Sequence, residues 1–130
     1  MTGTFTASGV VTLTTDLGHK GPYVATMKGV MLARFPQMRI VDLTHDILVH
    51  WPAEAGFWLR RSYRYFPRGT VHVAVVDPAG RAGRTVLVIV HDGHCFVVPD
   101  NGLLGQLDPE VATVYRFDPR KGVPLGLPEP

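Results

Sequence analysis

The spacing of apolar residues predicts alternating strands and helices over the first 76 residues. Val10 to Thr15 is a short run rich in Val, Leu and Thr that stops at a turn signal, which is typical of a buried strand. From Pro22, apolar residues recur at helical spacing until Pro36 ends the pattern. The expected elements are strands over 10–15, 39–43 and 70–76 and helices over 22–35 and 52–66.

The second expected helix has one apolar face and one basic face. Pro52 suits the first helical position. The basic residues Arg60, Arg61 and Arg64 lie on the outer face. The residues expected on the inner face are Ala55, Trp58, Leu59, Ser62 and Phe66.

The second half of the chain predicts antiparallel strands. Two apolar runs, 84–90 and 94–98, are joined by His91-Asp92-Gly93, and Asp-Gly between apolar runs is typical of a hairpin. We expect a short helical piece over 103–107 and a last strand over 112–117.

These elements predict an α/β fold, in which a layered sheet of largely parallel strands is flanked by helices and carries a β-hairpin. The run 70–76 is apolar enough to be buried on both faces. We assign residues 1–117 to one α/β domain. Residues 118–130 hold four prolines and two glycines and are expected to form a tail or part of an interdomain linker.

Composition narrows the classes of function. The chain has 130 residues and a formal net charge of +2, which is far from the basic stripe of a nucleic-acid-binding protein. Its apolar runs are much shorter than the roughly 20 residues that span a membrane. One cysteine, Cys95, allows no internal disulfide. We therefore expect a cytoplasmic protein that binds neither nucleic acid nor membranes.

In an open α/β sheet, ligands bind beyond the carboxyl ends of the strands, so the polar residues there are the first candidates. Asp16 follows the first strand and could hold a ribose diol, or it could simply form a turn. Asp77 and Arg84 begin and end the loop between two strands and could form an ion pair. Such a pair would be either a structural contact or an ionised carboxylate that orients a water molecule.

Two histidine clusters suggest a metal site, but their spacing argues against one. Thr44-His45-Asp46 with His50 lacks the spacing of a helical His pair, and its side chains are more typical of loop capping. His91, Asp92 and His94 flank the expected hairpin turn and are interpreted as a solvated turn. We predict no metal.

Six segments, taken together, resemble the S-adenosylmethionine hydroxide adenosyltransferases, a family related to the fluorinase and chlorinase. The resemblance covers roughly residues 10 to 117, and the segments follow the family's order and spacing. The segments are Thr12–Gly18, Pro22–Val24 with Met27–Gly29, Ile40–His45, Ser62–Pro67 with Gly69–His72, Val75–Pro78, and Pro99–Leu104.

The resemblance implies an α/β N-terminal domain that is followed, in full-length members, by a smaller β-barrel domain. It also implies homotrimers that bind S-adenosylmethionine between the N-terminal domain of one subunit and the C-terminal domain of its neighbour. We expect this chain to carry the N-terminal domain alone, with the β-barrel domain absent.

The resemblance also assigns residues to the site. Asp16 matches the carboxylate that holds the ribose hydroxyls, and Trp51 matches an aromatic residue near the reacting end of the substrate. Asp77 and Arg84 match two members of an Asp, Arg, His set. The third member lies in a His-Gly-Arg-Asp segment, which does not occur in these 130 residues.

The loop after Asp77 departs from the family pattern. Hydrolases of the family usually have Asp-Pro-Gly-Val-Gly there, whereas this chain has Ala79 and Arg81 at the third and fifth positions. Ala79 would be strained wherever the backbone needs a positive φ, and Arg81 adds a positive charge near a cationic substrate. The interval from Asp77 to Arg84 is preserved.

The function implied is that of an S-adenosylmethionine hydrolase, which forms adenosine and methionine with no cofactor. A carboxylate at position 77 favours water over a halide ion as the nucleophile. Two alternatives remain. One is a non-catalytic domain that binds adenosine-like ligands or forms oligomers, and the other is a general α/β ligand-binding domain.

Overall fold

The computed structural model describes residues 5–48, 51–76, 85–105 and 112–117. The expected order of strands and helices is confirmed, with boundaries close to those expected. The elements are β1 (Val10–Thr15), α1 (Tyr23–Arg34), β2 (Arg39–Thr44), α2 (Pro52–Ser62), the 3₁₀ turn η1 (Tyr63–Tyr65), β3 (Val71–Val75), β4 (Val86–His91), β5 (His94–Pro99) and β6 (Ala112–Phe117).

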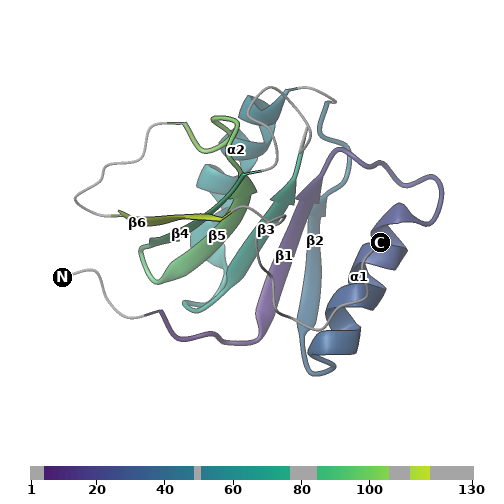
Figure 1. Ribbon diagram of the computed structural model, residues 1–130, viewed down its shortest axis with the longest axis horizontal. Coiled ribbons are helices and arrows are strands. Elements are labelled where there is room, and N and C mark those ends of the chain that lie inside the picture. Colours follow the sequence, from purple (N-terminus) through teal and green to yellow (C-terminus); the bar gives the residue numbers. More distant parts are fainter. Residues whose placement is uncertain (1–4, 49–50, 77–84, 106–111, 118–130) are drawn as a thin grey trace.

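The described strands form one mixed sheet in the order β2-β1-β3-β5-β4-β6 (Figure 1). The strands β2, β1, β3 and β5 are parallel, and β4 and β6 extend the sheet by antiparallel pairing. β1 lies between β2 and β3, with Thr15 opposite Val75. The predicted α/β fold with largely parallel strands is therefore confirmed.

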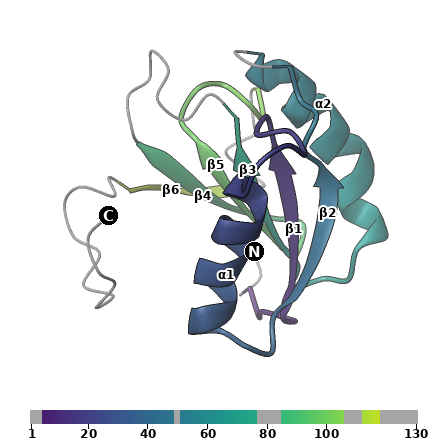
Figure 2. The ribbon, with the colours of Figure 1, turned by 90° about the vertical axis from the view of Figure 1, so that its right-hand side faces the viewer.

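The two helices lie on opposite faces of the sheet (Figure 2). The hydrophobic core lies on the α2 face. There Ala55, Leu59 and Tyr63 pack against Ala74 of β3 and Phe96 of β5. Alternate residues of the strands point to opposite faces, so one set of side chains supplies this core.

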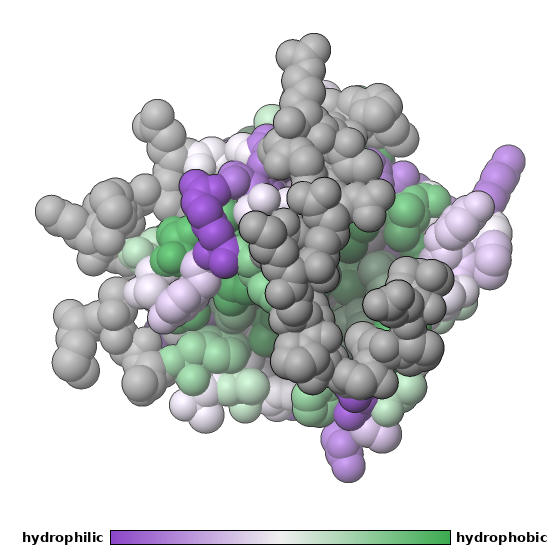
Figure 3. All heavy atoms as spheres, viewed as in Figure 1, coloured by the Kyte–Doolittle hydropathy of each residue, from purple (hydrophilic) through white to green (hydrophobic). Residues whose placement is uncertain are grey.

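The α1 face is covered less completely. No residue of α1 is fully buried, and the valines of β3 and β4 that face this side are half-buried. Figure 3, drawn in the same view as Figure 1, shows hydrophobic side chains at the surface of this face. The expectation that the third strand is buried on both faces is therefore wrong, because burial alternates along β3 between buried and half-buried positions.

The predicted hairpin joins β4 to β5. Asp92 and Gly93 have φ values of 53° and 74°, as the two central residues of a type I′ turn require. His94 corrects the interpretation of this segment as a solvated turn. Its side chain is buried and lies 3.1 Å from the ring of His72, Nδ1 to Nε2.

Two other expectations need correction. In α2 the buried stripe continues from Leu59 to Tyr63, whereas Trp58 is 45% exposed and lies edge-on against Phe57. Tyr63, the first residue of η1, follows Ala55 and Leu59 at intervals of four residues and is buried with them. Leu103 lies in a turn rather than a helix, and it is buried all the same.

Candidate functional site

The polar residues that follow β1 and β3 meet at one edge of the sheet. Asp16 comes directly after β1, and its backbone N–H donates to the carbonyl oxygen of Val75 at 3.2 Å. Val75 is the last residue of β3 and stands two positions before Asp77. The arrowheads of β1 and β3 mark this edge in Figure 1. It is the edge at which ligands bind in open α/β sheets.

A tight turn carries Asp16. The N–H of Leu17 donates to the hydroxyl oxygen of Thr15 at 3.2 Å. Gly18, whose φ is 73°, donates its N–H to the carbonyl oxygen of His45 at 2.8 Å. The positive φ favours glycine at this position. The backbone on both sides of Asp16 is therefore held by hydrogen bonds.

His45 is a buried side chain with a partner on each ring nitrogen. Nδ1 lies 2.8 Å from the Thr15 hydroxyl oxygen, and Nε2 lies 2.8 Å from Oδ1 of Asp42. Lys28 donates to the other oxygen of Asp42 at 2.8 Å. Burial raises the pKa of Asp42, but the hydrogen bonds from Lys28 and His45 outweigh it, so the pKa lies below its usual value.

This geometry accounts for the first histidine cluster without a metal. Both ring nitrogens of His45 already have partners, and Asp46 lies 3.4 Å from His19 instead. His50 lies outside the described residues. Across the described ranges, no group of three or more His, Cys, Asp or Glu side chains is arranged to hold a metal ion.

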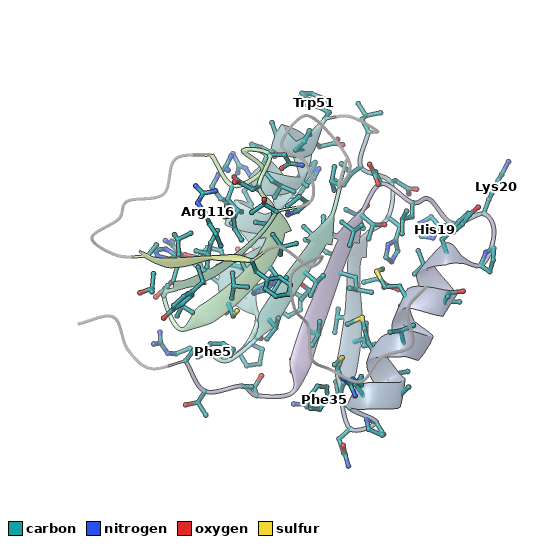
Figure 4. All side chains as sticks on the ribbon, viewed as in Figure 1. Phe5, His19, Lys20, Phe35, Trp51 and Arg116 are labelled. Carbon is teal, nitrogen blue, oxygen red and sulfur yellow. The ribbon has the colours of Figure 1, made fainter. Side chains whose placement is uncertain are left out.

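Trp51 lies at the same edge, immediately before α2 (Figure 4). Its backbone is fixed on both sides, because its N–H donates to Leu48 at 3.0 Å and its carbonyl accepts from Glu54 at 3.2 Å. Its side chain is 53% exposed. Pro52 is the first residue of the helix, as predicted. The indole is thus held at a fixed point while its ring remains accessible.

Asp77 and Arg84 lie outside the described residues, together with Ala79 and Arg81. The roles of these residues stay predictions. The structure does show how the flanking backbone is held.

One turn, Pro99 to Gly102, contacts both ends of the segment 77–84. The Asn101 side-chain amide donates to the Val76 carbonyl at 2.9 Å, and the Asp100 N–H donates to the Thr85 carbonyl at 2.9 Å. The residues on either side of the segment are therefore anchored to one turn. In the sheet, β5 lies between β3 and β4, and this turn follows β5. The predicted ion pair of Asp77 with Arg84 stays a prediction.

Sequence reasoning missed the contribution of Asn101. It lies in one of the six resembling segments, but no local pattern indicated that its amide reaches β3, which is 25 residues away in the chain. Its side-chain oxygen is buried and has no hydrogen-bond partner among the described residues. The only local signal was the turn sequence Pro-Asp-Asn-Gly itself.

A separate cavity of about 190 Å³ lies between α2 and the β4–β5 hairpin. It contains none of the predicted site residues. It is lined by Arg60, Tyr63, Arg64, His91, Phe96 and Leu104.

The helices of the described segments are all too short or too polar to cross a membrane.

Comparison with known proteins shows the family to which the chain is similar. Residues 11–124 match the family model described as the S-adenosylmethionine hydroxide adenosyltransferase N-terminal domain. The chain is 36% identical over 117 residues to an (R)-S-adenosyl-L-methionine hydrolase of Thermus thermophilus, covering 87% of this chain and 45% of that protein. An alignment of 147 positions with a fluorinase of Actinoplanes shows 28% identity and covers 93% of this chain and 49% of that protein.

Solved structures show the same fold. An uncharacterized conserved protein of Thermotoga maritima superposes with a TM-score of 0.66 at 35% identity, covering 73% of this chain and 36% of that one. A conserved hypothetical protein of Thermus thermophilus gives a TM-score of 0.63 at 36% identity, covering 72% and 39%. The chain thus spans less than half the length of these relatives. It belongs to the S-adenosylmethionine hydroxide adenosyltransferase and fluorinase family and corresponds to the N-terminal region of that family.

Proposed function

We propose that this chain provides the N-terminal part of an S-adenosylmethionine hydrolase, in which water attacks the ribose C5′ and yields adenosine and methionine. The observation that carries the proposal is the sheet edge itself. Asp16 is held beside the end of β3, and one turn anchors both ends of the segment that contains Asp77 and Arg84. The hydrolase names of relatives such as the Thermus thermophilus protein support the same assignment.

Asp16 and Trp51 are the proposed substrate contacts. A carboxylate can accept hydrogen bonds from both hydroxyls of a ribose diol, and such charge-assisted bonds are the stronger kind. Trp51 offers an exposed aromatic ring at the same edge. An aromatic face attracts a cation, so it suits the sulfonium end of the substrate.

The chemistry requires alignment more than basicity. The water oxygen forms a bond to C5′ while the C5′–S bond breaks, and the electron pair of that bond stays on sulfur to give neutral methionine. The attacking water loses one proton, which passes to solvent. Asp77 accepts a hydrogen bond from the water and Arg84 holds Asp77, so the nucleophile is placed in line behind C5′. No metal or organic cofactor is required by this scheme.

Water is the proposed nucleophile in preference to a halide ion. A fixed carboxylate at position 77 repels chloride or fluoride at close range and accepts hydrogen bonds from water. The proposal includes assembly as a homotrimer in the cytoplasm, with part of each site supplied by a neighbouring subunit.

The experiment that tests this function is incubation of S-adenosylmethionine, with and without chloride, with a protein in which this chain replaces the matching N-terminal part of the Thermus thermophilus relative. Chromatography then resolves adenosine, methionine and any 5′-halogenated adenosine. Adenosine as sole nucleoside product, reduced at least tenfold by Asp77→Asn, is the expected result. Halogenated product would overturn the choice of nucleophile. Binding without turnover would favour the non-catalytic adenosyl-binding alternative.

A further inference from the structure

A chain of polar side chains runs from the surface to the turn that carries Asp16. It starts at Lys28 on α1, passes through Asp42 on β2 and His45, and ends at the hydroxyl of Thr15. Each of the three links measures 2.8 Å. Thr15 is fully buried, and the His45 side chain is only 2% exposed, whereas 42% of Asp42 is exposed.

The hydrogen positions in this chain follow from its chemistry. The Asp42 carboxylate, whose pKa is lowered, can only accept, so Nε2 of His45 carries a hydrogen and donates it. In its neutral form the imidazole has one N–H, which leaves Nδ1 as an acceptor. In that form the Thr15 hydroxyl donates to Nδ1, and its oxygen accepts the N–H of Leu17.

The same residues also hold the backbone around Asp16. The carbonyl of His45 accepts the N–H of Gly18 at 2.8 Å, and the carbonyl of Thr15 accepts the N–H of Ile47 at 3.2 Å. Asp16 thus lies between Thr15, whose hydroxyl contacts the ring of His45, and Gly18, whose N–H is bonded to the carbonyl of His45. The backbone on both sides of Asp16 is therefore tied to His45, while the Asp16 N–H itself is bonded to Val75.

We propose that the Asp42–His45–Thr15 chain is a positioning device that fixes the carboxylate of Asp16 for recognition of a ribose diol. The inference rests on the proposed role of Asp16 in the function above. His45 and Thr15 are positioning residues, since they act through Asp16 and its turn. A device of this kind favours ligands with both ribose hydroxyls, because a fixed carboxylate loses one hydrogen bond when a hydroxyl is removed.

The test measures the ratio of the dissociation constants for 2′-deoxyadenosine and adenosine. We expect a ratio of roughly ten or more for the unmodified chain, which is the value of one hydrogen bond to a charged group. Thr15→Val removes the hydroxyl but keeps the shape of the side chain, and we expect the ratio to fall at least threefold, toward the value for Asp16→Asn. Thr15→Ser restores the hydroxyl and is expected to restore the ratio.

The fold supplies a matched control three residues earlier in the same strand. Thr12 makes an equivalent buried contact, with its hydroxyl oxygen 2.8 Å from Nδ1 of His72, and it lies away from Asp16. Thr12→Val therefore removes a similar hydrogen bond and is expected to leave the ratio unchanged. A ratio that falls equally in Thr12→Val and Thr15→Val would show a general effect on stability and overturn the inference.

The remaining outcomes separate this inference from the proposed function. An unmodified chain that does not prefer adenosine overturns the ribose-binding role of Asp16, and the positioning device falls with it. If the unmodified chain prefers adenosine and Thr15→Val keeps the same preference, the positioning device is overturned. The ribose-binding role of Asp16 then stands. If Thr15→Val does not fold, Asp42→Ala removes the hydrogen bond to His45 at the exposed end of the same series of side chains. This variant is expected to lower the ratio of the two dissociation constants.

Discussion

The buried histidines His45 and His72 show how one residue type takes different tasks in one sheet. His45 lies between an ionised carboxylate and a hydroxyl, so its hydrogen-bond directions are defined. His72 lies between the Thr12 hydroxyl and another imidazole, that of His94, and stacks on the ring of Phe96. Within the described ranges no carboxylate is recorded beside His72, and burial there favours the neutral ring.

This environment predicts an acid-sensitive fold. Burial, followed by the charge of His94, lowers the pKa of His72 from 6.5 to about 4. The unfolded chain therefore binds a proton more readily, and stability is complete above pH 6.5 and is lost as the pH falls toward 4. The shift corresponds to a loss of roughly 3 kcal/mol in the free energy of unfolding. Urea unfolding at a series of pH values measures it.

Two variants isolate the contribution of His72. His72→Gln keeps a hydrogen-bonding side chain but cannot titrate, so we expect a flatter dependence of stability on pH between 6.5 and 4. His19 is 68% exposed at its side chain, and His19→Gln serves as the control for replacing a histidine at the surface. An unaltered slope in His72→Gln would contradict the assignment.

Asn101 carries a second prediction at the scale of single residues. Its amide holds the Val76 carbonyl at the start of the proposed catalytic segment. Asn101→Asp keeps the size of the side chain but loses this donor, and it leaves the carbonyl facing a carboxylate. We expect a loss of about 1–3 kcal/mol in the free energy of unfolding, the usual cost of a buried group without a partner. Chemical denaturation tests it, and an unchanged midpoint would contradict it.

The sequence predicts that Asp16 follows the first strand, but it does not show what holds that residue. Asp16 could be placed because a turn signal follows an apolar strand, and the edge of the sheet follows from the fold class. The contact between His45 and Thr15 spans 30 residues and depends on how β1 and β2 pair, including a register shift between Leu13 and Thr14. No pattern within one strand shows which residues of β1 and β2 lie opposite each other. The hydrogen bond from Asn101 to Val76, at the end of β3, could not be predicted for the same reason.

At the scale of elements, the two helices differ in how closely they approach their neighbours. Gly56 of α2 lies against the backbone of Leu103, where an added Cβ would stand 1.6 Å from the carbonyl oxygen. Gly29 of α1 has nothing within 4 Å of an added Cβ. The same substitution therefore has opposite effects in the two helices.

We expect Gly56→Ala to destabilise the fold by at least about 2 kcal/mol, since either the helix or the 99–104 turn must shift. We expect Gly29→Ala to stabilise it by about 0.5–1 kcal/mol, because alanine favours a helix where there is space. Thermal unfolding of both variants measures the contrast. A stabilised Gly56→Ala would show that α2 does not pack on Leu103 as described.

Element order was predictable because each strand and helix has its own periodicity, whereas packing detail was not. The inner face of α2 was misplaced at Trp58 because periodicity shows the direction of the apolar face but not its width, and the buried stripe is limited to Ala55, Gly56, Leu59 and Tyr63. The valine-rich run 70–76 indicated a strand buried on both faces, but burial of its second face requires a covering element. α1 covers the part of that face nearest β1 and β2 (Figure 2).

At the scale of the whole molecule, the two faces of the sheet differ in how firmly they are covered. The α2 face carries the continuous core. On the other face, the side chains of Tyr23 and Phe35 at the two ends of α1 are each 65% exposed. One polar contact from α1 to the sheet is the ion pair of Lys28 with Asp42, which is partly exposed. Such pairs contribute at most about 1 kcal/mol.

This asymmetry predicts that α1 opens more readily than the rest of the fold. Local opening is easiest where few apolar side chains are buried, so amide hydrogens of 23–34 should exchange faster than those of α2 and β1. Hydrogen exchange read by NMR tests this at low protein concentration. Equal protection of the two helices would contradict it.

If copies of the chain associate through the α1 face, protection of α1 should rise with protein concentration while protection of α2 stays constant, because binding stabilises only the surface it covers.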